Sequence, residues 1–337
     1  MSSQIGPRHA AWLRILGSRM GSPQETERGM DAEKKIKQIL KRYRVDRGKG
    51  FDLADYDPDE TGGFDKDFKP EAQNLQQQHL LQLTELQDKL YAQDRRALLL
   101  IFQAMDAAGK DGTIKHVMSG VNPEGCQVFS FKAPSAEELD HDCLWRTSRC
   151  LPQRGHIGIF NRSYYEEVLV VRVHPELLHK EHIPEELIDK KIWKRRFEDI
   201  MAFERYLTRN GIAVRKFFLH LSRSEQRRRF LARLEEPEKN WKFSAADVRE
   251  REYWNDYQNA FEDMIRHTAA RHAPWFVVPA DHKWFTRLVV SFAVVDALKE
   301  MKLAYPTVDA EPRKALQAAK RALAAEAGGK GAHGKGR

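Results

Sequence analysis

Residues 97–113 of the chain are ALLLIFQAMDAAGKDGT, and this stretch decides the fold that the sequence predicts. Its first part, 97–103, is rich in Leu and Ile and shows no alternation of polar and apolar residues. Such a run is typical of a strand that is covered on both faces of a parallel sheet. Small residues and glycine then lead into an amphipathic segment. The stretch therefore predicts a strand, a phosphate-binding loop and a helix, in that order.

The loop after this strand, residues 104–113, predicts which atoms would surround a phosphate group. Backbone N–H groups of small residues can close around phosphate oxygens, and the N-terminus of the next helix adds partial positive charge. Lys110 would supply a mobile cation for the transferred group. The other residues that we assign to phosphate or nucleotide binding are Ala107, Ala108, Gly109, Asp111, Gly112 and Thr113. A β-turn with a chance lysine is the alternative when the loop is taken alone.

The loop departs from the usual pattern G-x-x-x-x-G-K-[ST] in two places. Ala104 stands at the first glycine, and Asp111 replaces the hydroxyl that normally binds Mg²⁺. Another hard oxygen ligand is therefore needed. We predict that Asp106, inside the loop, holds Mg²⁺, with Mn²⁺ as an alternative metal. Asp111 is the weaker choice, since it can point to solvent.

A second apolar run, HIGIF at residues 156–160, ends in Asn161 and Arg162. P-loop proteins place a metal-binding group at the end of such a strand. Asn161 can bind or orient a ligand but carries no charge, which leaves Asp106 as the main carboxylate near the metal. Arg162 can bridge two phosphate oxygens, which a lysine cannot do, although a surface arginine at a strand end is the alternative. We predict that Asp106 and Arg162 lie close enough to share one bound phosphate.

Further apolar runs predict the rest of a sheet, at residues 126–131, 156–161, 212–221 and 275–279. Amphipathic segments separate these runs, which is typical of an α/β fold with a parallel sheet. Helix starts are predicted at Ser135 with Glu138, at Ser222 with Glu225, at Pro184 for a helix to about Leu207, and at Asp281 for a helix to Met301. The sequence thus predicts five parallel strands with helices on both faces.

Composition and charge limit the class of protein. The chain has 337 residues, of which 41% are hydrophobic and 31% charged, and its net charge is +8. No apolar run is long enough for a membrane span, so the cytoplasm is the expected location. The positive charge favours an anionic partner, which can be nucleic acid, a phosphorylated metabolite or a polyanion. Cysteine and histidine spacings show no structural metal site.

Four segments, in this order, resemble the polyphosphate kinase 2 family: FQAMDAAGKDGT, SFKAPSAEELDHD, GIFNRSYYEEVLVVRVHPE and EEPEKNWKFS. The resemblance covers roughly residues 45–305, and the aspartate inside the loop is specific to it. It implies a thymidylate-kinase-like P-loop fold in three layers, with a central parallel five-stranded sheet, a helical lid and Mg²⁺ dependence. It also implies transfer of the terminal phosphate of inorganic polyphosphate to AMP or ADP, and so ATP regeneration.

The resemblance also assigns roles to single residues. Asp106 matches the family's catalytic loop aspartate, and Lys110 matches its phosphate-binding lysine. Arg162 matches the arginine after the second strand, and Arg172, in VLVVRVHP, matches a phosphate-contacting arginine. These roles imply a site in which several cations surround the phosphates of donor and acceptor.

The lid is expected at about residues 223–251, where Lys and Arg outnumber Asp and Glu. Arg229 and Arg233 lie four residues apart, hence on one face of a helix, and match the family's phosphate-binding positions. A solvated helix with ion pairs to neighbouring glutamates is the alternative. Asp247 matches an acidic lid position of the family, or is the third residue in a capping pattern that starts at Ser244.

Acceptor and partners follow from the same resemblance. Asn161 and Glu166 replace the aspartate and asparagine of the subgroup that prefers diphosphates, which implies the subgroup that accepts both mono- and diphosphates. AMP, ADP and ATP are the expected nucleotides, with guanine nucleotides as further candidates, and the family implies a homo-oligomer. Neither a membrane nor a nucleic acid is an expected partner. An ATP-dependent nucleoside monophosphate kinase and a basic nucleic-acid-binding protein with a vestigial P-loop are the alternatives.

The ends of the chain differ from its middle. Residues 1–30 are polar and lack periodicity, so we predict a disordered leader, with Met30 as an alternative start. Residues 31–305 are expected to form the P-loop kinase domain. Residues 306–337 are expected to begin as a helix and to continue as a disordered basic tail.

Overall fold

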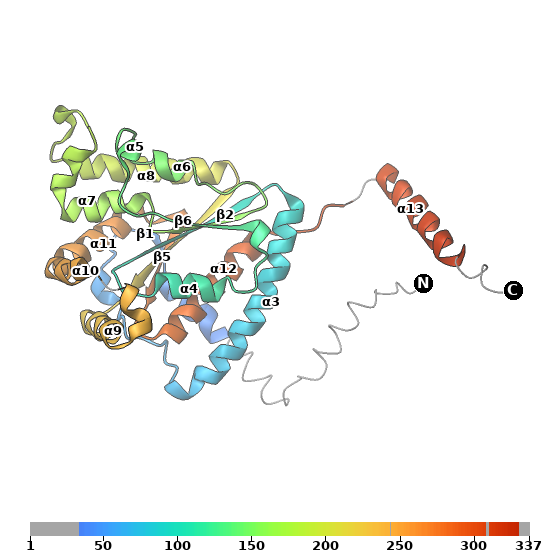
Figure 1. The fold of residues 1–337 in the computed structure, drawn as a ribbon, viewed down its shortest axis with the longest axis horizontal. Helices are drawn as coiled ribbons and strands as arrows, with labels where there is room; N and C mark the ends of the chain where they lie inside the picture. The colour runs from blue at the N-terminus through green and yellow to red at the C-terminus, as the bar shows by residue number, and fades with distance from the viewer. Residues whose placement is uncertain (1–33, 243, 308–309, 330–337) are drawn as a thin grey trace. The chain divides into compact units, whose positions relative to one another are not determined.

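The computed structural model describes residues 34–242, 244–307 and 310–329. The chain divides into two units, Met1–Leu303 and Ala304–Arg337. The first contains the sheet and its covering helices (Figure 1), and the second contains helix α13, Ala310–Gly329. The predicted leader, residues 1–30, and the last part of the predicted tail, residues 330–337, lie outside the described residues.

The sheet of the first unit has six strands in the order β1-β6-β5-β2-β4-β3. Their bounds are β1 Arg44–Arg47, β2 Ala97–Ala104, β3 Cys126–Ser130, β4 Ile157–Asn161, β5 Ile212–His220 and β6 Ala270–Pro279. The strands β2 to β6 run parallel to one another, as predicted. Strand β1 is an addition that the sequence did not predict, and it pairs antiparallel with β6.

The predicted count of five strands was wrong because β1 is short and mostly polar. Only Val45 of its four residues is buried. Strand β6 also begins five residues before the predicted start at Trp275. Its first half contains Pro274, which has no N–H for a ladder hydrogen bond, and the register between β1 and β6 shifts in that region. Both deviations lie at the edge of the sheet.

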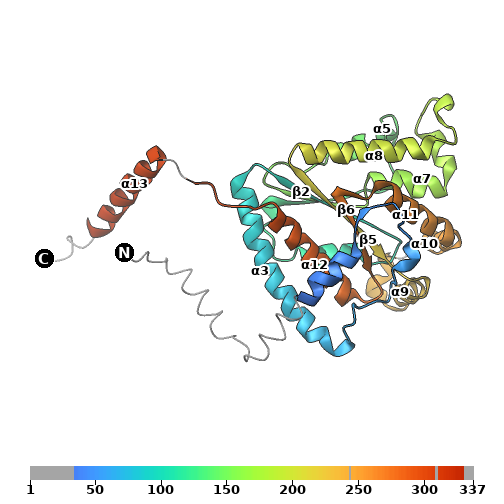
Figure 2. The same cartoon turned by 180° about the vertical axis from the view of Figure 1, so that it is seen from behind.

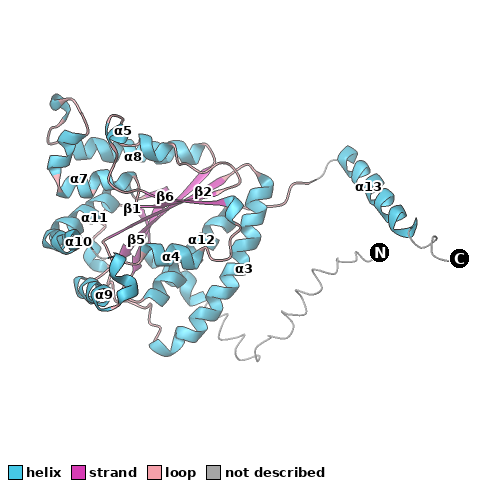
Figure 3. Ribbon diagram, in the orientation of Figure 1, coloured by secondary structure: helices cyan, strands magenta, loops and turns pink. Residues whose placement is uncertain are grey.

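Helices cover both faces of the sheet, with α3, α4 and α12 on one face and α7, α8 and α11 on the other (Figures 1 and 2). Figure 3 shows the strands enclosed between these two layers. The α-helices are residues 34–43, α3 Lys69–Gln93, α4 Lys110–Val117, α5 Ala136–Leu139, α6 Trp145–Ser148, α7 Val170–Val173, α8 Ile192–Arg209, α9 Arg223–Glu235, α10 Ala245–Arg249, α11 Trp254–Thr268 and α12 Lys283–Glu300. Short 3₁₀ turns include η4 Tyr164–Val168, η6 Glu185–Leu187, η7 Pro237–Lys242 and η8 Glu250–Tyr253.

Strand β2 shows why its apolar run carries no polar alternation. Leu98, Leu100 and Phe102 pack into the core beneath α3, α4 and α12. Leu99 and Ile101 pack into the core beneath α8 and α11. Since successive side chains point to opposite faces, a strand covered on both sides is expected to be apolar at successive positions, as residues 98–102 are. The predicted three-layer α/β arrangement is confirmed.

Two predicted helix starts were correct and two were wrong. The hydroxyls of Ser135 and Ser222 accept from the backbone N–H three residues on, as predicted. Pro184 instead precedes the 3₁₀ turn η6, and α8 begins only at Ile192, because the Asp189 carboxylate accepts from the N–H of Lys191 and forms a turn. His282, not Asp281, is the N-cap of α12.

The carboxyl ends of β2, β4 and β5 meet at one edge of the sheet. Phe102 is opposite Asn161 on one side of β2, and Ala104 is opposite Leu219 on the other. The chain leaves β2 toward β3 and β4, and later crosses to β5, so β2 lies where the strand order reverses. Ligands of open α/β sheets bind at such a point.

Candidate active site

The predicted phosphate-binding loop joins β2 to α4 at this edge. Ala107 has a φ of 64° and Gly109 a φ of 99°, both in the left-handed region. Gly109 precedes α4 as its N-cap, where glycine adopts this conformation without a steric penalty. Asp111, Gly112 and Thr113 form the first turn of the helix. The strand, loop and helix predicted from residues 97–113 are all present.

Lys110 lies beneath this loop with only 9% of its surface exposed. Its Nζ donates to the carbonyl of Ala104 over 3.0 Å. Burial, followed by the charge of Arg162, lowers the pKa of Lys110, while Asp106 opposes this shift. The lysine is therefore a desolvated cation that gains free energy from any anion bound above the loop.

Asp106 and Arg162 meet at the mouth of the loop. Nη2 of Arg162 donates to Oδ1 of Asp106 over 2.8 Å, and Nη1 donates to Oε2 of Glu166 over 3.3 Å. The backbone N–H of Arg162 donates to the carbonyl of Phe102 over 3.0 Å, which fixes the arginine beside β2. Glu166, burial and Asp106 act on its pKa in that order of size, and the net effect is to raise it. The predicted proximity of Asp106 and Arg162 is present, and about a third of each side chain is exposed.

Asn161 and Asp111 form a second contact beside this pair. Nδ2 of Asn161 donates to Oδ1 of Asp111 over 2.6 Å and lies 3.4 Å from Oγ of Ser130. Asp111 therefore points toward β4 and does not simply face solvent. Asn161 acts here as the link between the first turn of α4 and the end of β4.

Two cavities adjoin at Arg162 and Glu166, which line both of them. The smaller one, of about 40 Å³, lies between the loop and the lid. Its polar lining residues are Asp106, Arg162, Glu166, Gln226, Asp247, Glu250, Arg251 and Tyr257. The larger one, of about 270 Å³, is bounded by residues 132–146 and 162–181 and includes Lys132, His141, Arg146 and Glu167. The small space suits a phosphate group, and the larger one suits an organic ligand.

The lid follows β5 and comprises α9, η7, α10 and η8, close to the predicted 223–251. Asp247 of α10 faces the small cavity and lies 3.9 Å from Nη1 of Arg233. Burial, and then the nearby Asp106, raise the pKa of Asp247. The lid thus brings a second carboxylate toward the loop aspartate, while the functional role of Asp247 stays a prediction.

The three arginines Arg172, Arg229 and Arg233 have different surroundings. Arg233 is 22% exposed and has the loose contact with Asp247. Arg229 is 7% exposed and donates to the carbonyls of Ala107 and Ala108. Arg172 pairs with Asp263 of α11 and lines neither cavity, so its phosphate contact stays a prediction.

The donor atoms at the loop fit a magnesium ion. In the part of the chain that the structure describes, no three His, Cys, Asp or Glu side chains form a site of protein atoms alone. Mg²⁺ usually takes only one or two protein carboxylates and completes its shell with phosphate and water oxygens. Asp106 and Asp247 line one small cavity, and their repulsion would be relieved by a cation between them.

Sequence reasoning missed several lining residues. Gln226 of α9 donates to the carbonyl of Asp106 over 3.0 Å, and Arg251 donates to Gln226 over 2.5 Å. Lys132 lies in the motif SFKAPSAEELDHD, which the sequence singled out without giving it a role. That motif was the available signal for the larger cavity. No comparable signal marks Gln226, because its position depends on how α9 packs over the loop.

Comparison with known proteins places the same residues within one family. A family model described as Polyphosphate kinase 2 (PPK2) matches residues 65–306, which include the loop, both cavities and the lid. A Rhodopseudomonas palustris protein named ADP-polyphosphate phosphotransferase is 52% identical over 277 residues, 82% of this chain and 95% of that protein. A Meiothermus ruber protein named AMP/ADP-polyphosphate phosphotransferase is 42% identical over 277 residues, 82% of this chain and 98% of that protein.

The fold has a counterpart among solved structures. The crystal structure of polyphosphate kinase 2 from Arthrobacter aurescens matches with a TM-score of 0.75 at 40% identity, and the match covers 84% of this chain and 95% of that one. In the described ranges, no helix has the length and apolar character that crossing a membrane requires.

Proposed function

The chain belongs to the polyphosphate kinase 2 family and is a polyphosphate-dependent nucleotide phosphotransferase, and we propose that it transfers the terminal phosphate of inorganic polyphosphate to AMP and ADP. The contact between Asp106 and Arg162, above the buried Lys110, carries this proposal. A carboxylate for a metal and a fork of N–H donors for phosphate stand side by side where two cavities meet. This geometry suits two phosphate chains that approach each other end to end.

The chemical step is an in-line displacement. A terminal phosphate oxygen of the nucleotide attacks the terminal phosphorus of polyphosphate. A new P–O bond forms, the bond to the bridging oxygen breaks, and the shortened polyphosphate leaves with that electron pair. Since the attacking phosphate is largely ionised near neutral pH, no strong general base is required. The residues act by positioning and by stabilising charge.

Each cation has a place in this step. Lys110 neutralises charge from beneath the loop, and its burial strengthens that interaction since little water screens it. Arg162 exchanges its contact with Asp106 for the transferred phosphate, which it can bind through two N–H groups. Arg233 of the lid adds charge on the opposite side. Losing Lys110 or Arg162, which face the transferred phosphate, is expected to cost two to three decades in rate, roughly 3–4 kcal/mol of barrier.

Asp106 is the residue proposed to hold Mg²⁺, with Asp247 as a second carboxylate and Mn²⁺ as an alternative ion. Such a metal supplies positive charge that offsets the charge of the phosphate oxygens. With Asp106 holding the metal, Arg162, which now donates to that carboxylate, would be available to bind phosphate.

The choice between AMP and ADP is the finer part of the proposal. Asn161 and Glu166 indicate an enzyme that accepts both, and the Meiothermus ruber relative is named for both acceptors. The Rhodopseudomonas palustris relative, at higher identity, is named for ADP alone. Glu166 lines both cavities, so its electrostatic interaction with the acceptor depends on how many phosphates the acceptor carries. We propose that both nucleotides are accepted. Guanine nucleotides and a homo-oligomer stay predictions.

The test is to incubate the purified chain with Mg²⁺, polyphosphate and either ADP or AMP. We expect ATP from ADP, and ADP followed by ATP from AMP, both detected by ion-exchange chromatography. Replacing polyphosphate by ATP as the donor for AMP is the control. An ATP-dependent monophosphate kinase would work at least as well with that donor, and this result would overturn the proposal.

A further inference from the structure

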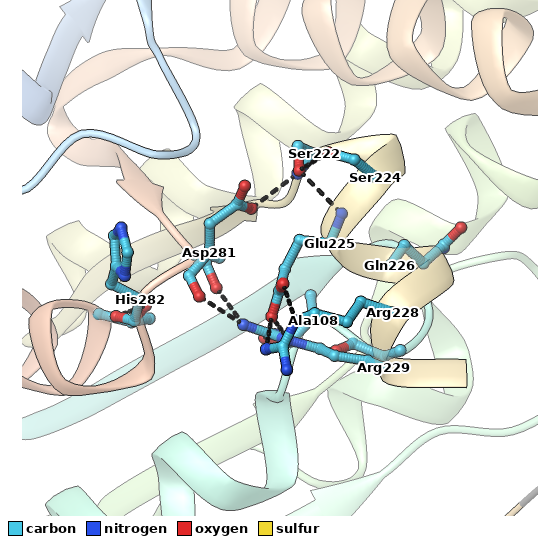
Figure 4. Close-up of polar contacts among 12 residues, drawn as sticks. Ala108, Ser222, Ser224, Glu225, Gln226, Arg228, Arg229, Asp281 and His282 are labelled. Atoms are coloured by element: carbon cyan, nitrogen blue, oxygen red, sulfur yellow. Dashed lines mark hydrogen bonds and ion pairs between the residues drawn. The ribbon is translucent and has the colours of Figure 1, made fainter. Parts of the chain in front are cut away.

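Arg229 is unusual among the lid arginines because all its donors are occupied. Nε donates to Oε1 of Glu225 over 2.7 Å. Nη1 donates to the carbonyls of Ala107 and Ala108 over 3.0 and 2.9 Å. Nη2 donates to the carbonyls of Ala280 and Asp281 over 2.6 and 3.0 Å. A guanidinium has five N–H groups, so none is left for a phosphate in this arrangement (Figure 4).

These bonds join three segments that are far apart in sequence. Arg229 connects the lid helix α9, the phosphate-binding loop and the turn between β6 and α12. Asp281 supports the same junction, because its carboxylate accepts from the N–H of Ser222, the N-cap of α9, over 2.9 Å. Gln226 adds a bond to the carbonyl of Asp106. The carbonyls of three successive loop residues therefore accept hydrogen bonds from α9.

The loop needs such support because its backbone is strained. Ala107 is not a glycine, yet its φ of 64° lies in the left-handed region, which is disfavoured for residues with a Cβ atom. Strained residues persist where the surroundings fix them, and they cluster at functional sites. Arg229 fixes the Ala107 carbonyl directly, and Ala107 separates Asp106 from Ala108 in the phosphate-binding loop.

We propose that Arg229 is a positioning residue that holds the loop in its substrate-binding shape, and that it is not a phosphate ligand. The lid arginine that meets polyphosphate is then Arg233, one helical turn further on, which is part exposed and loosely paired. The assignment of substrate to Arg233 rests on the proposed function. The support that Arg229 gives to the loop is a property of the unliganded chain, and it can be measured without any substrate.

The alternative is that the lid moves and Arg229 turns toward phosphate. That movement would break five hydrogen bonds at once and leave four backbone carbonyls in a buried place without this donor. Glu225 opposes it further. Burial raises the pKa of Glu225, but hydrogen bonds from Arg228 and Arg229 outweigh this and lower it, so the carboxylate stays charged beside the guanidinium.

Hydrogen–deuterium exchange of the unliganded chain is the first test. We expect Arg229→Ala to increase exchange at least about tenfold in peptides that cover residues 104–113, because the loop loses its anchor. Arg228→Ala is the matched control on the same helix, since Arg228 is 69% exposed and its ion pair is with Glu225. It should leave the loop unchanged. Unaltered exchange in Arg229→Ala, with the fold intact by circular dichroism, would overturn the proposal.

Kinetics separate the two arginines. Arg233→Ala should raise KM for polyphosphate about tenfold and reduce by about one unit the slope of log KM against log salt, because one phosphate contact is lost. Arg229→Ala should reduce kcat about 100-fold and leave that slope unchanged. Arg229→Lys keeps the charge but cannot hold four carbonyls, so it should stay within about threefold of Arg229→Ala. A lysine that restores activity, or a reduced slope in Arg229→Ala, would contradict the proposal.

Rescue gives the sharpest distinction. Glycine adopts a positive φ without strain, so Ala107→Gly in the Arg229→Ala background should recover activity about fivefold. The same glycine in the Arg233→Ala background should recover nothing. Equal recovery in both backgrounds, or none in either, would show that loop shape is not what Arg229 controls. If the wild-type chain showed no phosphotransfer activity, the proposed function would be refuted. Hydrogen–deuterium exchange would still decide the role of Arg229.

Discussion

Two ion pairs with similar N–O distances lie in very different surroundings. Arg162 and Asp106 are 2.8 Å apart at the active site, and about a third of each side chain is exposed. Lys216 and Glu204 are 2.6 Å apart between β5 and α8, and neither is exposed at all. The difference teaches that close pairing alone does not identify function. What distinguishes the functional pair is that its partners can be exchanged for ligand atoms.

The buried pair is satisfied from every side. Lys216 also donates to the hydroxyl of Tyr165 and the carbonyl of Thr268, and both Tyr164 and Tyr165 donate to Glu204. No ligand could replace these bonds without opening the core. The two tyrosines lie two and three residues after Arg162 in the chain. The buried pair therefore belongs to the core that stabilises the fold, whereas the exposed pair belongs to the site.

The largest effect is expected from Asp106→Asn, which breaks the exposed pair while keeping its shape. We expect kcat/KM to fall at least about 10³-fold, at least roughly 4 kcal/mol of barrier, because the carboxylate no longer holds a metal or orients Arg162. The free energy of unfolding should change by less than about 1 kcal/mol, as for other exposed pairs. Steady-state rates and urea denaturation measure the two quantities. A rate like that of the wild type would remove Asp106 from the mechanism.

Breaking the buried pair should give the opposite pattern. Lys216→Met leaves Glu204 charged and unpaired in the core, and we expect a loss of about 3 kcal/mol in the free energy of unfolding. The double variant Lys216→Met with Glu204→Gln should regain part of that loss, because the buried charge is gone. In both variants kcat of the folded protein should stay within about threefold. A large fall in kcat at unchanged stability would give Lys216 a catalytic role.

A third ionisable group, Glu167, lies in the wall of the larger cavity. Burial, and then Glu181, raise the pKa of Glu167 to about 7 from an ordinary value of 4.5, although Arg146 and Arg196 oppose the shift. A raised pKa means that the folded state holds the proton more tightly than the unfolded state. The stabilising effect of that proton is complete below about pH 4.5 and is lost as the pH rises to about 7.

Glu167→Gln tests this pH dependence. Relative to the variant, we expect the wild type to lose roughly 2 kcal/mol in its free energy of unfolding between pH 5 and pH 7, in proportion to the pKa shift. Urea denaturation of both proteins across this range measures the difference. Parallel pH profiles would show that Arg146 and Arg196 keep the carboxylate ionised in the folded state.

The sequence predicted the parts of the fold that local chemistry determines. The apolar run 97–103 and the loop after it predicted the central strand and the phosphate site, because a strand buried on both faces is mostly apolar. The sequence did not predict strand β1, because three of its four residues are polar and its strand conformation depends on pairing with β6. The start of α8 was predicted wrongly because a turn at Asp189 overrides the helix-starting tendency of Pro184.

The candidate site was predictable only in part. Asp106, Lys110 and Arg162 follow strands whose ends must meet at one edge of the sheet, so their proximity could be inferred. Arg229 and Arg233 look equivalent in the sequence, as two arginines one turn apart. Only the packing of α9 over the loop shows that Arg229 is buried against carbonyls while Arg233 stays part exposed beside Asp247. Equal spacing on a helix says nothing about which residue the tertiary structure covers.

The smallest effect is expected from substituting Arg172. The sequence predicts that this residue contacts phosphate, whereas the structure shows it in an ion pair with Asp263. Its guanidinium lies 2.5 Å from Asp263, and both side chains are about one quarter exposed, so the pair contributes less than about 1 kcal/mol. If pairing is its whole role, Arg172→Ala should cost no more stability than Asp263→Asn, which also weakens the contact with Arg266, and both should leave KM for polyphosphate within about twofold. If Arg172 reaches phosphate during turnover, Arg172→Ala alone should raise KM, because Asp263→Asn frees the arginine and keeps its charge. Measuring KM and unfolding for both variants decides whether Arg172 belongs with the exchangeable residues of the site or with the fixed residues of the fold.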